Sequence, residues 1–282
     1  MAMASAHTVD LRKHPVDDAV ARVERALRVD LDRASVVRKR RSVGAVTDRG
    51  TWVRIERRPA SRVGTQGWNG TEAAGALVGI SKPEWFAGVS WREGNEAMWR
   101  ADETSLLPDT PVKAGTLMVA PNLPDEWWVE LSSSLDSLAA QSTSRVATPD
   151  TVTITQAGVS AAIRRTFSSS VDTTISRWTP AHADLNWANV TAPTFCLFDW
   201  EDWGMAPAGL DSASLWANSL AVPELAERVW RERRKDLECR DGLLMALFCL
   251  AKIVGDYADE RDPKLRPAQQ AAARIVGELT DH

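Results

Sequence analysis

The sequence HADLNWAN occupies residues 182–189, and CLFDWE follows at residues 196–201. These segments contain Asp184, an asparagine five positions later (Asn189) and a second aspartate ten positions after that (Asp199). Phosphoryl transfer from a nucleotide requires side chains of these types. One carboxylate faces the acceptor hydroxyl, while an amide oxygen and a second carboxylate hold Mg²⁺ against the phosphates. The pattern therefore predicts a site for phosphoryl transfer.

The residues between Asn189 and Asp199 predict a short β-hairpin, because two β-prone segments lie on either side of a turn at 192–194. A hairpin brings Asn189 and Asp199 to the same end, where their oxygens are two hard ligands for one small cation. Asp184 then lies in the loop before the first strand. We interpret His182 as a residue that holds this loop and not as the catalytic base.

The segment HADLNWANV…CLFDWED resembles the catalytic segment of the aminoglycoside phosphotransferase and choline kinase-like family, over about residues 180–216. The resemblance implies an α+β chain with the two-lobed protein-kinase-like fold: an antiparallel-sheet N-lobe and a mainly helical C-lobe, here 1–120 and 121–282. It also implies a Mg²⁺-dependent enzyme that transfers the γ-phosphate of ATP or GTP to a hydroxyl of a small molecule. The sequence departs from the family at Trp187, where such kinases usually carry a small residue or proline.

The resemblance further implies a cation that contacts the phosphates, on the strand after the phosphate-covering loop. The family usually has lysine or arginine there; residues 51–55 contain no lysine, so Arg54 is the candidate. A helix glutamate holds the lysine of a kinase, and Glu72 is the only acidic residue in 58–82. The sequence thus predicts a pair between Arg54 and Glu72 at the nucleotide. An exposed strand arginine and a carboxylate at a helix N-terminus are the open alternatives.

Glu201 and Asp202 follow the second aspartate and lie between Trp200 and Trp203. Carboxylates and indoles at the mouth of a cleft suit an amine or a quaternary ammonium. These residues therefore predict contacts to a cationic acceptor, such as an aminoglycoside, an amino sugar or a choline-like molecule. Both tryptophans also suit a hydrophobic core, and this alternative stays open.

Hydrophobic periodicity and turn residues predict the other elements. Expected helices lie at residues 15–30, 72–78 (capped by Thr71), 125–140, 218–238, 242–256 and 268–279, and an interrupted one covers 159–166 and 171–178. Expected strands lie at 35–41, 51–57 and 151–155 and within 83–120, the last at 116–120. The resemblance implies that Asp211, which opens a further helix, anchors the catalytic loop.

Composition limits the class of protein. The 282 residues, 44% of them hydrophobic, suffice for one large domain or two lobes. The net charge of −4 gives no electrostatic case for binding nucleic acid. Three cysteines without ligand spacing predict reduced thiols and a cytoplasmic location. We expect neither a signal peptide nor a membrane span, because the longest apolar run, 243–251, is too short. The acceptor, the nucleotide and the oligomeric state stay open.

The sequence also allows two functions other than a small-molecule kinase. A non-catalytic kinase-like protein, binding nucleotide or acting as a scaffold, is favoured by the missing lysine and the scarcity of glycine near the first strands. The presence of Asp184, Asn189 and Asp199 together opposes it, because a scaffold needs none of them. A protein kinase is disfavoured, because the interval from Asp199 to Asp211 is too short for an activation loop and lacks an Ala-Pro-Glu segment.

Overall fold

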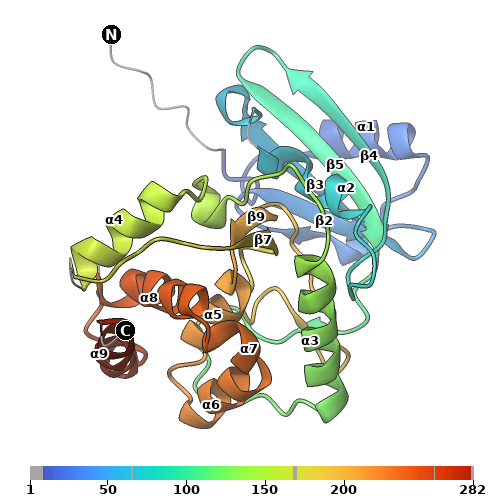
Figure 1. The fold of residues 1–282 in the computed structure, drawn as a ribbon. Coiled ribbons are helices and arrows are strands. Elements are labelled where there is room, and N and C mark those ends of the chain that lie inside the picture. The colour runs from blue at the N-terminus through green and yellow to red at the C-terminus, as the bar shows by residue number, and fades with distance from the viewer. Residues whose placement is uncertain (1–8, 65, 168–169, 257, 281–282) are drawn as a thin grey trace. The chain divides into compact units, whose positions relative to one another are not determined.

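The computed structural model describes residues 9–64, 66–167, 170–256 and 258–280 (Figure 1). The chain divides into two compact units. One consists of Met1–Ala76 and Pro83–Leu107, the other of Leu77–Lys82 and Pro108–His282. Residues 108–120, which the sequence interpretation places in the first lobe, belong to the second unit in this division.

The first unit contains a five-stranded antiparallel sheet with the strand order β1-β2-β3-β5-β4. Its strands are β1 (Val37–Arg38), β2 (Ser42–Val46), β3 (Thr51–Pro59), β4 (Trp85–Glu93) and β5 (Ala97–Ser105). Arg54 of β3 lies opposite Gly44 of β2 and Asp102 of β5. Because side chains alternate along a strand, Val53 and Ile55 point to the face opposite Arg54. One face is therefore apolar and the other is polar.

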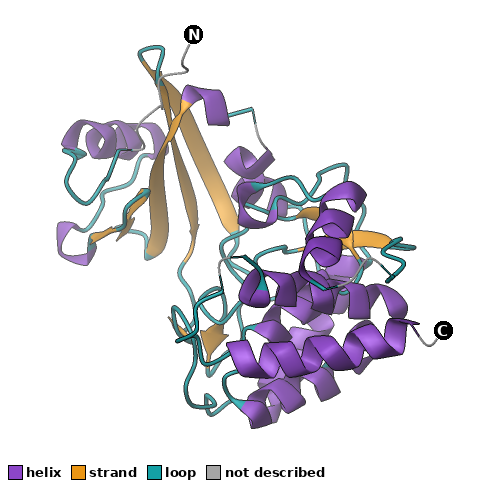
Figure 2. Ribbon diagram, turned by 90° about the vertical axis from the view of Figure 1, so that its left-hand side faces the viewer, coloured by secondary structure: helices purple, strands orange, loops and turns teal. Residues whose placement is uncertain are grey.

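Helix α1 (Asp17–Leu27) covers the apolar face of this sheet (Figure 2). Val20 and Val23 of α1 are buried in one hydrophobic cluster with Val53 and Ile55 of β3. The spacing of these valines puts them on the same side of the helix, which suits packing on a flat apolar surface. A second helix in this unit, α2 (Gly70–Ala74), is one turn long.

The second unit is mainly helical. Its helices are α3 (Asp125–Ala139), α4 (Gln156–Thr166), α5 (Leu210–Ala217), α6 (Pro223–Glu232), α7 (Arg234–Leu237), α8 (Arg240–Val254) and α9 (Leu265–Thr280). Two small antiparallel pairs join β6 (Thr110–Pro111) to β8 (Thr191–Ala192) and β7 (Trp178–Ala181) to β9 (Gly204–Pro207). Short 3₁₀ turns in the chain lie at Arg33–Ser35, Ala60–Arg62, Gln66–Asn69 and Pro149–Thr151. Among the described residues, no helix has both the length and the apolar character that crossing a membrane requires.

The predicted α+β class, with an antiparallel sheet and a mainly helical part, is confirmed, but several elements differ from the prediction. Residues 42–46 form strand β2 and not a connection, because Val43 and Ala45 are buried in the core. Residues 116–120 form no strand, and Met118 and Val119 there are 60% and 76% exposed. These two valine-containing segments have similar compositions, and only burial separates them.

Two further predictions are wrong for reasons that lie in the backbone. Residues 151–155 form no strand, because Asp150 and Thr151 have left-handed φ angles of 57° and 65° that end a 3₁₀ turn. Residues 171–177 form no helix. The carboxylate of Asp241 accepts the backbone N–H groups of Ser176 (3.0 Å) and Arg177 (2.8 Å), which would otherwise donate to helical carbonyls. Helix α2 begins at Gly70, ahead of the predicted cap Thr71.

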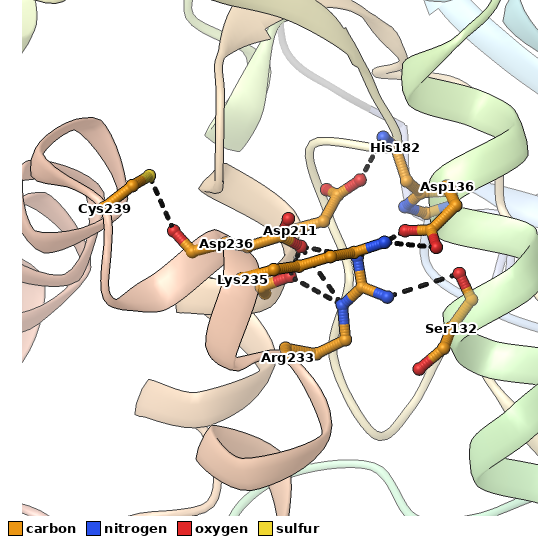
Figure 3. A network of polar contacts seen from close by, with 9 residues as sticks. Ser132, Asp136, His182, Asp211, Arg233, Lys235, Asp236 and Cys239 are labelled. Carbon is orange, nitrogen blue, oxygen red and sulfur yellow. Dashed lines mark hydrogen bonds and ion pairs between the residues drawn. The ribbon is translucent and has the colours of Figure 1, made fainter.

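A buried arginine joins three helical segments of the second unit (Figure 3). Arg233, between α6 and α7, is 2% exposed. Its guanidinium donates to Asp136 of α3 (2.9 Å) and Asp236 of α7 (2.5 Å), and to the carbonyl oxygen of Ser132 (3.2 Å). Asp236 also accepts the hydroxyl of Ser212 on α5 at 2.6 Å. The arginine therefore fixes α5 and α7 relative to α3.

Replacing this arginine tests how much the network stabilises the fold. Arg233→Met leaves the carboxylates of Asp136 and Asp236 without their buried partner, so we expect a loss of about 3–5 kcal/mol in the free energy of unfolding. Lys235→Met removes an exposed partner of the same Asp136 and should cost about 1 kcal/mol or less. Urea denaturation measures both variants. Equal losses would show that burial of Arg233 adds nothing.

Candidate active site

Asp184 lies in the loop that follows β7, and two amide side chains hold its carboxylate. Asn189 donates to its Oδ2 at 2.8 Å and Asn186 donates to its Oδ1 at 3.0 Å. The same two amides also donate to the backbone carbonyl of Asp184, at 2.9 and 3.0 Å. The carboxylate is therefore fixed in direction by its own loop.

The loop is anchored from α5 by Asp211, as the resemblance implied. This buried carboxylate accepts the backbone N–H groups of His182 (2.7 Å) and Ala183 (2.8 Å). Ala183 has a left-handed φ of 69°, a costly conformation for a residue with a Cβ. His182 is fully buried, and its Nε2–H donates to the carbonyl of Phe198 at 3.0 Å. Burial lowers the pKa of His182, so the neutral ring is a scaffold group of the loop.

The predicted hairpin brings Asn189 and Asp199 to one end. Val190 and Leu197 form an antiparallel bridge, and the N–H of Phe198 donates to the carbonyl of Asn189 at 3.0 Å. Asp199 has a left-handed φ of 67°, so its backbone turns sharply at this point. Its charge acts on the carboxyl of Asp184, which places these two acids within electrostatic reach of each other.

The donor set fits a hard cation such as Mg²⁺. The amide nitrogen of Asn189 donates to Asp184, which leaves Oδ1 of Asn189 as the oxygen for a cation. With the carboxylate of Asp199 this makes two oxygen ligands, and Mg²⁺ commonly takes its remaining ligands from substrate phosphates and water. In the described part of the chain, no group of three or more His, Cys, Asp or Glu side chains has an arrangement suited to a metal.

Burial raises the pKa of Asp184 to about 6. The negative charges of Asp199 and Asp150 act in the same direction, whereas the hydrogen bonds from Asn189 and Asn186 act against it. A carboxylate with this pKa changes its charge close to neutral pH, where proton transfer to and from it is easiest.

Trp187, where the sequence departs from the family, is a core residue. It is 1% exposed and stacks on Trp127 of α3 with ring centroids 5.8 Å apart. Its Nε1–H donates to the hydroxyl of Ser219 at 3.1 Å. The indole therefore attaches the loop that carries Asp184 to the helical core.

The segment after Asp199 is more buried than the sequence suggests. Trp200 and Trp203 are each 3% exposed, so the core alternative is confirmed for both. Asp202 is 8% exposed, and its Oδ1 accepts the hydroxyl of Thr148 at 2.6 Å. Burial raises the pKa of Asp202 to about 6. Glu201 is partly exposed. Contacts of Glu201 and Asp202 with an acceptor stay a prediction.

A cavity of about 440 Å³ in the second unit opens beside Asp184. Asn186 and Trp187, from the loop that carries Asp184, line one wall. Acids and lysines from distant parts of the chain line the rest: Asp150, Lys252, Asp259, Asp262 and Lys264. No local motif points to these residues, because α8 and the segment before α9 reach the cavity only through tertiary packing.

In the first unit, the structure shows a partner for Glu72 that the sequence analysis missed. Oε2 of Glu72 accepts from Arg100 of β5 at 3.0 Å, and Arg100 also donates to Asp102 at 2.6 Å. Arg54 lies 3.9 Å from Oε2 of Glu56. The pair of Arg54 with Glu72 stays a prediction. No local pattern indicates this pair, because Arg100 lies on a strand and Glu72 on a helix 28 residues earlier in the chain.

The comparisons agree with this architecture. No family model matches the sequence, and no curated protein matches it. Solved structures share its fold, which is the two-lobed kinase-like fold of small-molecule phosphotransferases. The resemblance drawn from the catalytic segment is confirmed at the level of the fold.

Three of these structures are nucleotide complexes. Amicoumacin kinase hAmiN, with AMP-PNP, Ca²⁺ and its ligand, is 12% identical and has a TM-score of 0.54, covering 94% of this chain and 93% of that one. A thermostable mutant of aminoglycoside phosphotransferase APH(4)-Ia, with ADP and hygromycin B, is 12% identical with a TM-score of 0.56 and coverages of 93% and 98%. Aminoglycoside 2'-phosphotransferase-IIIa with GDP is 13% identical, with a TM-score of 0.52 and coverages of 93% and 98%.

Asp202 gives a stability prediction for this site. Its raised pKa means that the folded state holds the proton more tightly, so the free energy of unfolding falls as pH rises from about 4 to about 6. Asp202→Asn removes this loss, and its free energy of unfolding should exceed that of the wild type by up to about 3 kcal/mol at pH 8. Urea denaturation at pH 5 and pH 8 measures the difference.

The matched control is Asp256→Asn, at an exposed carboxylate that is paired with Arg165. Its effect should be small and nearly the same at both pH values. An Asp202→Asn variant that is less stable than the wild type at pH 8 would contradict the prediction.

Proposed function

We propose that this protein is a small-molecule kinase that transfers the γ-phosphate of ATP or GTP to a hydroxyl group. The observation that carries the proposal is the convergence of Asp184, Asn189 and Asp199 on one loop and one hairpin end, beside a cavity of small-molecule size. The nucleotide complexes of proteins with the same fold support it. A cytoplasmic location, where both nucleotides are available, belongs to the proposal.

Each group has a role in the proposed reaction. Asp184 orients the acceptor hydroxyl and accepts its proton, and its raised pKa makes it a competent base at neutral pH. Asn189 and Asp199 hold the cation. When bound, Mg²⁺ neutralises charge on the nucleotide phosphates. Little proton transfer has to precede P–O cleavage, because the transition state is loose. Orientation of the hydroxyl by a fixed carboxylate is therefore the main contribution of the loop.

The first unit contributes the proposed phosphate contact. Arg54 is the strand cation, and an arginine fork binds phosphate oxygens in pairs. Glu72, the proposed partner of Arg54, lies in the same unit and forms an ion pair with Arg100. An acceptor that carries an amine, as aminoglycosides and amino sugars do, is compatible with the carboxylates of the cavity. Glu201 and Asp202 stay the proposed contacts from the sequence.

Nucleotide binding tests the proposal directly. ATP or GTP with Mg²⁺ should raise the melting temperature by several degrees, since a ligand at 100 times its Kd stabilises by about 2.7 kcal/mol. Asp199→Asn should lose the part of this shift that depends on Mg²⁺. Asp184→Asn should keep the shift in melting temperature. In the presence of an acceptor, this variant should release nucleoside diphosphate about 10²–10⁴ times more slowly than the wild type. Asp256→Asn is the control and should behave as the wild type.

No shift with any nucleotide, with or without Mg²⁺, would refute the proposal. A full shift without turnover on any acceptor would favour the alternative, a non-catalytic kinase-like protein that binds nucleotide.

The pKa of Asp184 predicts the pH dependence of the reaction. The base works only when ionised, so kcat/KM should rise about tenfold per pH unit below pH 6 and level off above about pH 7. Initial rates from pH 5 to pH 8.5 measure this, with the melting temperature followed in parallel to exclude unfolding. A rate that stays flat down to pH 5 would show that ionisation of Asp184 does not limit the reaction.

A further inference from the structure

Two lysines on the cavity wall distinguish this pocket from a purely acidic one. Lys252 extends from the last turn of α8, and Lys264 precedes α9; both line the same cavity as Asp184. Four carboxylates line it as well: Asp150, Asp184, Asp259 and Asp262. A cavity of this kind holds opposite charges side by side, and it therefore suits a ligand that is not only a cation.

Lys264 has an ammonium group that lacks a hydrogen-bond partner within the described residues. Its side chain is only 15% exposed, so most of its length is covered by protein. The nearest carboxylate oxygen, Oδ2 of Asp262, lies 3.7 Å from Nζ, beyond hydrogen-bonding distance. The ammonium group of Lys264 therefore has an ion-pair partner in Asp262 but no hydrogen bond, on a residue that lines the cavity. An anionic group of a ligand would satisfy its N–H donors.

Lys252 is held in place by a hydrogen bond that uses one of its three N–H donors. Its ammonium donates to Oδ2 of Asp150 at 2.5 Å and lies 5.2 Å from the ring centroid of Phe248. Asp150 is the one hydrogen-bond acceptor that the described residues give it, which leaves two further N–H groups. Burial lowers the pKa of Lys252, but the opposite effects of Cys249, Asp150 and Asp184 are larger together. The pKa is therefore raised overall, and the group stays an ammonium.

The backbone beside this ion pair is strained. Asp150 and Thr151 are consecutive left-handed residues, and for the β-branched Thr151 this conformation is a genuine outlier. Such strain persists where the surrounding structure over-determines it and is frequent at binding sites. Here it places a carboxylate against Lys252 on the cavity wall.

We propose that the phosphoryl acceptor carries an acid group, such as a carboxylate, which Lys264 binds with help from Lys252, while its hydroxyl meets Asp184. The inference rests on the proposed function, because it names the acceptor class of that site. The carboxylates of the cavity also accommodate an amine, so zwitterions such as hydroxylated amino acids belong to the class. A polycation such as kanamycin should be a poorer acceptor than a zwitterion, because it meets the two ammonium groups as well as the four carboxylates.

Matched pairs of acceptors test the proposal. We choose L-homoserine with its amide, D-gluconate with D-gluconamide, and kanamycin as a polycation. Each acid should be phosphorylated with a KM at least about tenfold lower than that of its amide, because a hydrogen bond to a charged group is lost in the amide. Melting temperatures with each compound, without nucleotide, give a second readout that does not need turnover.

Variants assign the effect to the lysines. Lys264→Met and Lys252→Met keep most of each side chain but remove the ammonium, and each should reduce the acid-over-amide preference toward one. Lys235→Met, at an exposed lysine on α7, should keep the full preference. The nucleotide-dependent melting shift should be the same in all three variants, because none of these residues belongs to the proposed nucleotide site.

The outcomes separate the two proposals. The proposal of an acid-bearing acceptor is overturned if the wild type uses the amides or kanamycin as well as the acids or better. It is also overturned if the acid-over-amide preference survives in both Lys264→Met and Lys252→Met. Absence of binding and turnover with every acid also overturns it. In each case a retained nucleotide shift, together with turnover of some other acceptor, leaves the kinase proposal standing. Loss of the nucleotide shift in the wild type instead removes the kinase proposal itself.

Discussion

The loop that carries Asp184 depends on one buried carboxylate. Asp211 accepts two consecutive N–H groups, from His182 and Ala183, and holds Ala183 at a left-handed φ of 69°. Burial raises the pKa of Asp211, and the charge of Asp236 acts in the same direction, whereas His182 and the two N–H donors lower it. This carboxylate holds the backbone immediately ahead of Asp184. Without this clamp, nothing in the loop sequence would favour the strained conformation at Ala183.

The helices around α5 keep this clamp in position. Ser212, the neighbour of Asp211, donates to Asp236, which the buried Arg233 also binds. Asp241 of α8 holds the backbone of Ser176 and Arg177, just before the strand that leads into the loop. Two carboxylates that bind backbone N–H groups thus fix the chain that leads into the loop, one before β7 and one after it. Polar contacts of this kind direct a chain more specifically than apolar packing does.

The sequence predicted those site residues that are close together in the chain and have side chains suited to phosphoryl transfer. Asp184, Asn189 and Asp199 lie within one loop and hairpin, so their spacing alone indicates that they meet. Arg100 and Lys252 escaped prediction, because a partner in a neighbouring strand or a distant helix leaves no local pattern. The same limit explains the strand at residues 42–46 and the missing strand at 116–120. Similar valine-containing segments differ only in what covers them, and tertiary contacts decide that.

In the proposed kinase, the loop carries the reacting carboxylate and the cavity wall contacts the acceptor. Helix α8 is fixed near its start, where a Cβ on Gly242 would lie 1.7 Å from the carbonyl oxygen of Asp236. Its last turn bears Lys252, whose hydrogen bond runs to Asp150 and not to the loop that carries Asp184. Charge on the cavity wall can therefore differ without disturbing the Asp211 clamp. In the proposed kinase, an acidic and a mixed-charge cavity would therefore select different acceptors for the same proposed base, Asp184.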